Sequence, residues 1–391
     1  MTTLAKRLEG IGEYYFSQKL REIEALNKAG KNVINLGIGS PDLPPHPDVI
    51  SVLNEESCKP NVHAYQGYKG TPALRNAFAQ WYKTWYGVDL DPDTEILPLI
   101  GSKEGIMHIC MTYVNEGDYV LVPDPGYPTY RSATKLAGGR CMDYHLTEEH
   151  QWFPDFAQLT EMVKNSDRPV RLMFVNYPHM PTGKLPTRAL FEKLVAFGRE
   201  HDILICHDNP YSFILNDQPM SLLSVPGAKD VVVELNSLSK AQNMAGWRVG
   251  VLCGSSERVQ EVLRFKSNMD SGMFLPVQSA AVKALSLDKD WYQQLNAVYA
   301  KRRELVFELL QLLDCAFDRN QAGMFVWAKI NTRFKTGYEL SDHVLNNAAV
   351  FITPGGIFGS AGDGYIRVSL CSTEEKFRES IERIRAMDNG Q

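Results

Sequence analysis

Apolar runs and amphipathic helical stretches alternate along this chain from about residue 50 to residue 285. The run at 231–235 is apolar and β-branched, without the polar alternation of a half-exposed strand, and 203–208 is a second run of similar character. Uninterrupted runs of this kind are typical of parallel strands that helices cover on both faces. The pattern therefore predicts an α/β fold with a mostly parallel central sheet.

The remainder of the chain is expected to form a second, smaller unit. A long amphipathic helix is predicted from Asp290 through Leu313, followed by a strand at 324–330, a helix, and a strand at 364–370. A chain of 391 residues also exceeds what a single hydrophobic core normally serves. We therefore predict a large domain and a discontinuous small α+β domain, with bounds of 49–288 for the large one and of 1–48 with 289–391 for the small one.

Polar side chains gather just past the end of the predicted strand 231–235. Lys240 follows Ser237 and Ser239, and Arg248 stands eight positions further on. Open α/β sheets bind their ligands at the carboxyl ends of the strands. An amine placed there forms an imine with an aldehyde, while hydroxyls and a guanidinium hold a phosphate. This chemistry suits pyridoxal phosphate, although a solvated lysine after a strand gives the same short pattern.

A carboxylate stands at the end of the other predicted strand, 203–208. Asp208 is suited to pair with a protonated pyridine nitrogen, which keeps the ring an electron sink. Tyr211, three residues later, is suited to hydrogen-bond the phenolic oxygen of that ring. An aspartate after a strand is also common as the N-cap of a following helix, and this alternative stays open at the level of sequence.

Two further strand ends carry residues that suit the same ligand. Gly101 and Ser102 lie between an apolar strand and a helical run, where glycine permits close backbone approach and a helix start offers amides to an anion. Tyr127 follows the predicted strand 119–122 and suits stacking on a flat ring. Each motif alone also occurs in ordinary turns. Four strand ends directed at one cofactor are much less expected by chance.

Taken together, these motifs resemble the class I and II aminotransferases of the aspartate aminotransferase superfamily, which are fold-type I pyridoxal-phosphate enzymes. The resemblance runs nearly from end to end of the chain. Its motifs are Asn-Leu-Gly-Ile-Gly-Ser-Pro-Asp at 35–42, Tyr65 with Gly-Thr-Pro-Ala-Leu-Arg at 70–75, the segment 176–183, the lysine motif 237–248, Pro-Gly-Gly-Ile-Phe-Gly at 354–359, and Tyr-Ile-Arg-Val-Ser at 365–369.

The resemblance implies a fold, an activity and a role for each site residue. The fold is a mostly parallel seven-stranded sheet covered by helices, with the smaller α+β domain beside it. The activity is ping-pong transfer of an amino group between an L-α-amino acid and a 2-oxo acid through Lys240, the catalytic lysine. Arg367 is implied to bind the substrate α-carboxylate beside the backbone of Gly39. The implied cofactor-binding residues are Gly101, Ser102, Lys103, Tyr127, Asn176, Asp208, Tyr211, Ser237, Ser239, Lys240, Arg248 and, reaching over from the partner in a homodimer, Tyr65.

The chain departs from the family pattern at Met180. Members of the family usually carry asparagine before the Pro-Thr-Gly that here occupies 181–183. That asparagine hydrogen-bonds the phenolic oxygen of the cofactor, which a thioether can scarcely do. Asn176 is the nearest candidate to compensate. We expect the departure to affect the electronic properties of the bound cofactor rather than its binding.

The substrate is less well defined by the sequence. Residues 13–16 (Glu-Tyr-Tyr-Phe) match a segment that closes over the active site in related enzymes, or form one apolar face of a surface helix. Lys103 resembles the lysine that meets a distal carboxylate in LL-diaminopimelate aminotransferases, or is solvated at a helix start. The segment 266–274 lies where aspartate aminotransferases carry a side-chain arginine from the partner subunit, and its Met and Phe argue against strict dicarboxylate specificity. The chain is nearest to the alanine-, methionine- and diaminopimelate-type branches.

Two other functions are compatible with this fold. A C–S β-lyase acting on cysteine S-conjugates has the same lysine and releases a keto acid without an amino acceptor. A pyridoxal-phosphate-binding regulator without enzyme activity usually carries a DNA-binding domain ahead of the fold, whereas here the fold begins almost at once. The sequence therefore predicts an aminotransferase, with the β-lyase as the alternative.

Composition and charge narrow the possible partners. The net charge of −5 disfavours nucleic acid and anionic membranes. The seven cysteines are scattered without the spacing of metal ligands, so we predict reduced thiols and no metal site. The N-terminus lacks an apolar signal core, and no apolar run approaches the length of a membrane span. We expect a cytoplasmic homodimer that acts on small molecules.

Overall fold

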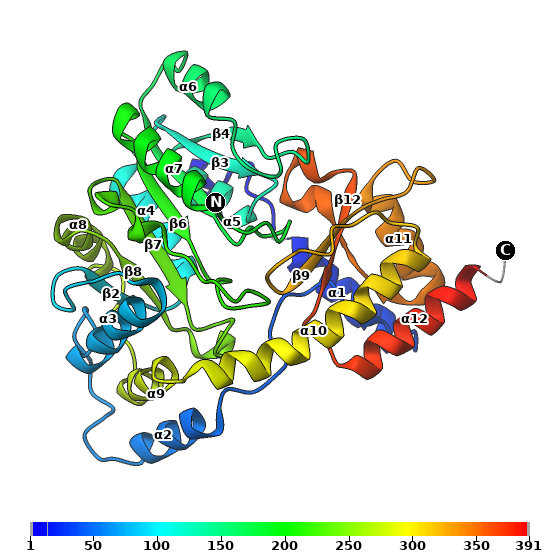
Figure 1. Cartoon of the computed structure of the whole chain (residues 1–391), viewed down its shortest axis with the longest axis horizontal. Coiled ribbons are helices and arrows are strands. Elements are labelled where there is room, and N and C mark those ends of the chain that lie inside the picture. Colours follow the sequence, from blue (N-terminus) through cyan, green and yellow to red (C-terminus); the bar gives the residue numbers. More distant parts are fainter. Residues whose placement is uncertain (1–2, 14, 389–391) are drawn as a thin grey trace.

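Figure 1 shows the computed structural model of the chain, which describes residues 3–13 and 15–388. The helices are α1 (Tyr15–Lys28), α2 (Pro47–Ser57), α3 (Pro72–Tyr86), α4 (Ser102–Tyr113), α5 (Pro128–Leu136), α6 (Phe156–Lys164), α7 (Arg188–His201), α8 (Ser256–Lys266), α9 (Leu275–Leu285), α10 (Lys289–Leu312), α11 (Gly337–Ala348) and α12 (Glu374–Asp388). The strands are β1 (Ile34–Asn35), β2 (Ile96–Leu99), β3 (Tyr119–Asp124), β4 (Arg140–His145), β5 (Val170–Asn176), β6 (Leu204–Asp208), β7 (Val232–Ser237), β8 (Gly250–Cys253), β9 (Phe325–Lys329), β10 (Val350–Phe351), β11 (Thr353–Pro354) and β12 (Tyr365–Ser369). None of the helices in the described part of the chain combines the length and the apolar character that a bilayer crossing requires.

The main sheet has seven strands in the described residues, in the order β2-β8-β7-β6-β5-β3-β4. Strands β3 to β7 pair in parallel, and β8 runs antiparallel to both of its neighbours. Because β8 is flanked by two strands of the opposite direction, β2 points the same way as β7. The prediction of a mostly parallel seven-stranded sheet is therefore confirmed.

Helices cover both faces of this sheet, which explains its uninterrupted apolar runs. In β5, Leu172 and Phe174 point into a core cluster that includes residues of α4, α5 and α8. Met173 and Val175 alternate with them and join the larger core cluster, to which α3, α7, α9 and α10 contribute. Successive side chains of one strand thus both lie in hydrophobic core, on opposite sides.

A smaller unit lies beside the main sheet (Figure 1). It contains the antiparallel sheet β11-β12-β9 and the parallel pair β1-β10, with α1, α11 and α12 close by. The predicted long helix and the two C-terminal strands are confirmed as α10, β9 and β12. Helix α10 is about 36 Å long at 1.5 Å per residue and passes from α9 to the small unit. The domain bounds given above stay a prediction.

Buried polar contacts tie the segment that follows β1 to the small unit. Arg302 of α10 donates to both carboxylate oxygens of Asp42 at 2.7 and 2.8 Å, and to the carbonyl oxygen of Leu370 at 3.1 Å. The backbone amide of Ser369 donates to the carbonyl oxygen of Leu36 at 2.7 Å. These bonds fix the chain around residue 39, which borders the cavity described next.

Candidate active site

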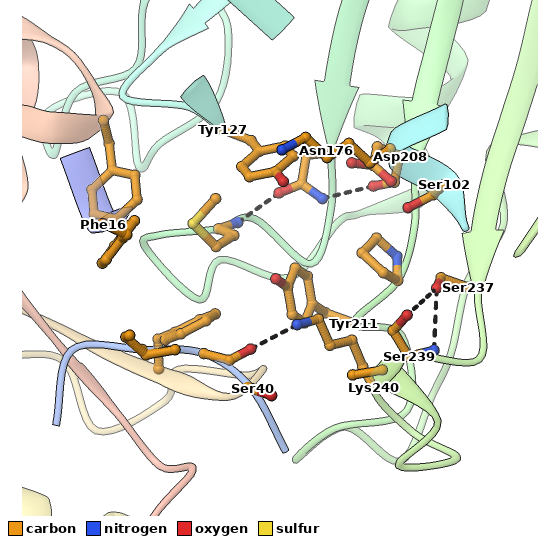
Figure 2. Close-up of a pocket in the computed structure, with 18 of the residues that line it drawn as sticks. Phe16, Ser40, Ser102, Tyr127, Asn176, Asp208, Tyr211, Ser237, Ser239 and Lys240 are labelled. Carbon is orange, nitrogen blue, oxygen red and sulfur yellow. Dashed lines mark hydrogen bonds between the residues drawn. The ribbon is translucent and has the colours of Figure 1, made fainter. Parts of the chain in front are cut away.

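A cavity of about 430 Å³ lies at the carboxyl edge of the main sheet (Figure 2). Asn176, Asp208 and Ser237 are the last residues of β5, β6 and β7, and all three line it. Arg248 precedes β8, and because β8 runs in the opposite direction its start lies at this same edge. The topology thus brings together side chains that are up to 72 positions apart in the sequence.

Lys240 is half-buried and lines the cavity. Its Nζ donates a hydrogen bond to the carbonyl oxygen of Gly39 at 2.8 Å. Burial lowers the pKa of the lysine, and the nearby cations Arg367 and Arg248 act in the same direction. The neutral amine that this favours is the form that attacks an aldehyde. Gly39 is required here because a Cβ would lie 2.2 Å from Cζ of Phe325.

One end of the cavity is built to hold an anion. The hydroxyls of Ser237 and Ser239 lie 2.9 Å apart, and Ser102 is the first residue of α4, where backbone amides have no helical partner. Gly101 has a φ of +85°, and a Cβ on it would lie 2.2 Å from Nη2 of Arg248. The guanidinium is therefore held directly against the helix start. Hydroxyls, amides and one permanent cation together suit a phosphate group.

Lys103 lies beside this anion-binding end and lines the cavity. Burial lowers its pKa, and the neighbouring charge of Arg248 adds to the effect. An anion bound between the two cations would relieve their repulsion.

Asp208 presents an unpaired carboxylate oxygen to the cavity. The hydroxyl of Tyr130 donates to Oδ2 at 2.7 Å, while the buried Oδ1 accepts no hydrogen bond from any residue that the structure describes. Burial raises the pKa of Asp208 to about 6. A protonated ring nitrogen would satisfy Oδ1 and stabilise the carboxylate, so the residue fits the pyridine of the expected cofactor. The N-cap alternative is wrong, because among the described residues the next helical turn after Asp208 begins only at Leu222.

Two tyrosines border the space between these polar groups. Tyr127 and Tyr211 both line the cavity, and Figure 2 shows their rings on different sides of it. Burial raises the pKa of Tyr211, so that its hydroxyl stays protonated and remains a donor. Its ring centroid lies 5.8 Å from Nζ of Lys240. The Tyr127 ring packs edge-on against Tyr130 at 5.6 Å, which fixes its plane.

Arg367 carries the other fixed charge of the cavity and is buried. Its Nη2 donates to the carbonyl oxygen of Gly37 at 2.8 Å, and its Nη1 to Sδ of Met180 at 3.3 Å. Phenyl rings surround the guanidinium, with centroids 3.8, 4.6 and 5.6 Å from its Cζ: those of Phe325, Phe358 and Phe16, respectively. Arg367 is 4% exposed, and a charge in such low-dielectric surroundings attracts a carboxylate more strongly than it would in water.

The side chain of Asn176 forms hydrogen bonds with backbone groups. Its Nδ2 donates to the carbonyl oxygen of Asp208 at 2.6 Å, and its Oδ1 accepts from the amide of Met180 at 2.8 Å. These bonds join the ends of β5 and β6 and fix the turn that carries Met180. Whether Asn176 also compensates for the missing asparagine stays a prediction.

The remaining expected residues are placed as follows. Tyr65 is 91% exposed and lies outside the cavity of its own chain. Phe16 lines the cavity, while Tyr14 of the same motif lies outside the described residues. Sequence reasoning placed Phe16 in a segment near the active site, but it assigned no role to Tyr130, Phe325 or Phe358. Tyr130 ends the Pro-Gly-Tyr-Pro-Thr-Tyr motif, which is the only sequence signal for it.

A buried charged cluster supports the start of α4 from behind. Glu104 accepts a hydrogen bond from the amide of Ile100, and its other oxygen lies 3.0 Å from Nε2 of His108. Asp270 completes a group whose ligand atoms lie within 4.8 Å of one another. The ammonium of Lys266 bonds both oxygens of Asp270 at 2.8 and 2.6 Å and so already supplies a cation.

Comparison with known proteins gives a consistent result. The model of the aminotransferase class I and II family matches residues 31–384. The chain is 40% identical over 386 residues to an LL-diaminopimelate aminotransferase of Halothermothrix orenii, covering 98% of each chain. It is 41% identical over 383 residues to the protein of the same name from Moorella thermoacetica, covering 97% of each.

Two solved structures superpose closely on this chain. The apo-BacF structure from Bacillus subtilis superposes with a TM-score of 0.93 at 36% identity, over 99% of this chain and 98% of that one. A probable N-succinyldiaminopimelate aminotransferase from Thermus thermophilus gives a TM-score of 0.88 at 31% identity, over 95% of this chain and 99% of the other.

Proposed function

Because this chain belongs to the class I and II aminotransferases, we propose that the cavity at the carboxyl edge of its main sheet is an aminotransferase active site organised around Lys240, Asp208 and Arg367. The protein is a pyridoxal-phosphate-dependent aminotransferase that moves an amino group between an amino acid and a 2-oxo acid. The assignment of roles to single residues is our proposal. The observation that carries it is the buried Oδ1 of Asp208, which has no partner among the described residues and lies in the same cavity as the half-buried Lys240 and the caged Arg367.

The residues present fit the cofactor. Ser102, Ser237, Ser239 and Arg248 would hold its phosphate, and Oδ1 of Asp208 would accept from its ring nitrogen. Gly101, Lys103, Tyr127, Tyr211 and Asn176 complete the predicted set. When bound, the group supplies an aldehyde for covalent attachment and a ring that accepts the electrons of a carbanion.

Lys240 acts as nucleophile and proton carrier in this proposal. Its Nζ is held in place by the carbonyl of Gly39, and burial lowers its pKa, so it would be the amine to which the aldehyde of the cofactor attaches. As a free amine, the same Nζ would carry the proton removed from the substrate Cα.

Arg367 orients the substrate in this proposal. A guanidinium binds a carboxylate bidentately, which fixes the direction of the bonds at the neighbouring carbon. The carbonyl of Gly37 and the aromatic cage hold the guanidinium before substrate arrives, so little side-chain entropy remains to be lost on binding.

We include a homodimer in the proposal, with Tyr65 reaching the phosphate of the partner's site. The support is a group of exposed apolar side chains on two neighbouring segments. Tyr65 is 91%, Met269 51% and Phe274 43% exposed. The rings of His63 and Phe274 stack at 5.8 Å, so the segments lie side by side. A cytoplasmic location is also part of the proposal, supported by the seven cysteines, all of which are free thiols.

The names of the relatives make LL-diaminopimelate the first candidate amino donor. It carries an ammonium and a carboxylate at both ends, so one end would bind at Arg367 and the other would need charged partners further along the cavity.

Two measurements test the proposed function. Borohydride reduction of the holoenzyme, followed by digestion and mass spectrometry, should place the cofactor on Lys240. A panel of L-amino acids should convert the absorbance of the bound cofactor, and a 2-oxo acid should restore it. Lys240→Ala should abolish both signals, whereas the surface variant Lys164→Ala should retain them. A label on another lysine, or keto acid release from a cysteine S-conjugate without an acceptor, would contradict the proposal, the latter in favour of the β-lyase.

A further inference from the structure

The polar groups of the cavity are unevenly distributed. Figure 2 shows Ser102, Ser237 and Ser239 together on one side and Phe16 on the opposite side. Phe16 lies against the guanidinium of Arg367, with 5.6 Å between its ring centroid and Cζ. A substrate bound at Arg367 therefore has its carboxylate next to the wall that contains Phe16, away from the anion-binding end.

Helix α1 provides much of this wall. Phe16, Ser17 and Leu20 line the cavity, and residues four positions apart lie on one face of a helix. Leu20 remains 44% exposed, as expected for a leucine that faces an open cavity rather than the core. Ile38 adds a second aliphatic side chain from the segment after β1.

The charged side chains of α1 are engaged elsewhere. Lys19 pairs with Glu22 at 2.7 Å and with Asp342 of α11 at 3.6 Å. Arg21 pairs with Glu13. The last two charged residues of the helix, Glu24 and Lys28, pair with each other at 2.7 Å. None of these groups is among the residues that line the cavity, so along the described part of α1 the wall presents only phenyl, aliphatic and hydroxyl groups.

No other acidic group compensates on this side. Asp208 is the only acidic side chain among the described lining residues, and it lies at the end of β6. On the segment proposed to face the partner subunit, Asp270 is neutralised by Lys266. The remaining basic residue, Lys103, lies beside Arg248 at the anion-binding end. A distal charge placed against Phe16 and Leu20 would therefore lose hydration to apolar side chains, and the charged side chain described beside it is Arg367, which is proposed to hold the α-carboxylate.

We infer that this enzyme prefers amino acids with an apolar side chain, aliphatic or aromatic, over substrates with a second charged end, and that Leu20 and Phe16 set this preference. The inference rests on the proposed function. The physical reason is that an apolar wall favours burial of apolar surface, whereas an unpaired charge placed there loses its hydration without compensation. LL-diaminopimelate, with two charges at its far end, is the strongest test of the inference.

The test compares rate constants for one half-reaction in the holoenzyme. Loss of the absorbance of the bound cofactor is followed by stopped flow with L-phenylalanine, L-leucine and L-methionine, and with LL-diaminopimelate, L-glutamate and L-aspartate. We expect the second-order rate constants of the apolar group to exceed those of the charged group by about 100-fold. Faster reaction with LL-diaminopimelate or L-glutamate would overturn the inference. If no amino acid reacts, the proposed function itself has failed.

A pair of matched variants tests whether Leu20 determines the preference for apolar substrates. Leu20→Arg places a cation on the cavity wall, and Gln18→Arg places the same charge on an exposed position of the same helix. Leu20→Arg should raise the L-glutamate to L-leucine rate ratio by at least about tenfold, and Gln18→Arg should leave the ratio unchanged. Equal ratios in both variants would show that Leu20 does not set the substrate preference. Because Leu20 is already partly exposed, both variants should fold, and a thermal melt of each checks this.

Discussion

Replacing Asp208 with asparagine should stabilise the cofactor-free protein against unfolding and slow the half-reaction of the holoenzyme. In the apoprotein the carboxylate is buried with one oxygen unpaired, and burial raises its pKa from 3.8 to about 6. A raised pKa in the folded state means that ionisation opposes folding, so the stability of the wild type falls as the pH rises through about 6. The rise corresponds to about 3 kcal/mol of lost stability at pH 8. Asp208→Asn has no charge to bury and avoids this loss.

The holoenzyme should respond in the opposite direction. A charged hydrogen bond between the carboxylate and a ring nitrogen contributes about 1.5–3 kcal/mol, and asparagine cannot supply its charge. The half-reaction with the best amino acid substrate should therefore slow by about 10- to 100-fold. The proposed phosphate contacts at Ser237 and Arg248 are untouched, so the cofactor should still bind.

Urea unfolding of the apoprotein between pH 4 and pH 8, together with stopped-flow half-reactions of the holoenzyme, measures both effects. The stability advantage of Asp208→Asn should be small at pH 4 and nearly complete at pH 7. Tyr130→Phe is the matched control, because it removes the other partner of the carboxylate while keeping the ring stacked on Phe174 at 4.7 Å. It should slow the half-reaction less than tenfold. An asparagine variant that is less stable than the wild type at pH 8 would refute the reasoning.

Three further predictions concern the substrate, the departure from the family and the interface. Arg367→Lys should raise the substrate concentration needed for half-maximal rate by at least about tenfold for every amino acid alike, since lysine loses the bidentate geometry; an effect confined to acidic substrates in steady-state kinetics would contradict this. Met180→Asn should lower the pKa of the imine between the cofactor and Lys240, because the amide donates to the phenolic oxygen; coinciding pH titrations of the absorbance would show the position to be electronically silent. Tyr65→Phe should weaken retention of the cofactor by about tenfold while sedimentation still reports a dimer, and unchanged retention would remove Tyr65 from the phosphate site.

Local sequence signals predict the sheet and its ligand-binding edge well. The strands ending at Asp208 and Ser237 are buried on both faces, so most of their residues are apolar, with the buried His207–Glu234 pair as an exception. The polar residue that follows such a run stands out for the same reason. The amino-acid sequence alone therefore predicts that Lys240 and Arg248 lie in one site.

Contacts between distant segments are not predictable in this way. The cage around Arg367 joins phenyl rings from α1, β9 and the turn after β11, whose sequence separations carry no period. Tyr130 bonds Asp208 across 78 positions, and only the parallel order of β3, β5 and β6 explains the contact. Asn176 is expected at the cofactor from the family resemblance, but its observed bonds go to backbone, a choice that depends on the turn it stabilises.

The charged cluster behind α4 has a consequence for how this protein keeps its cofactor. Glu104 and His108 belong to the helix whose first residue we propose to bind the phosphate, and Asp270 and Lys266 belong to the segment that we propose to face the second subunit. If cofactor binding and subunit association both act on this cluster, their coupling is reciprocal: the factor by which the cofactor tightens association equals the factor by which association tightens cofactor binding. Dilution should therefore promote cofactor loss by mass action, and the protein concentration of a preparation becomes one of the variables that set its content of active enzyme.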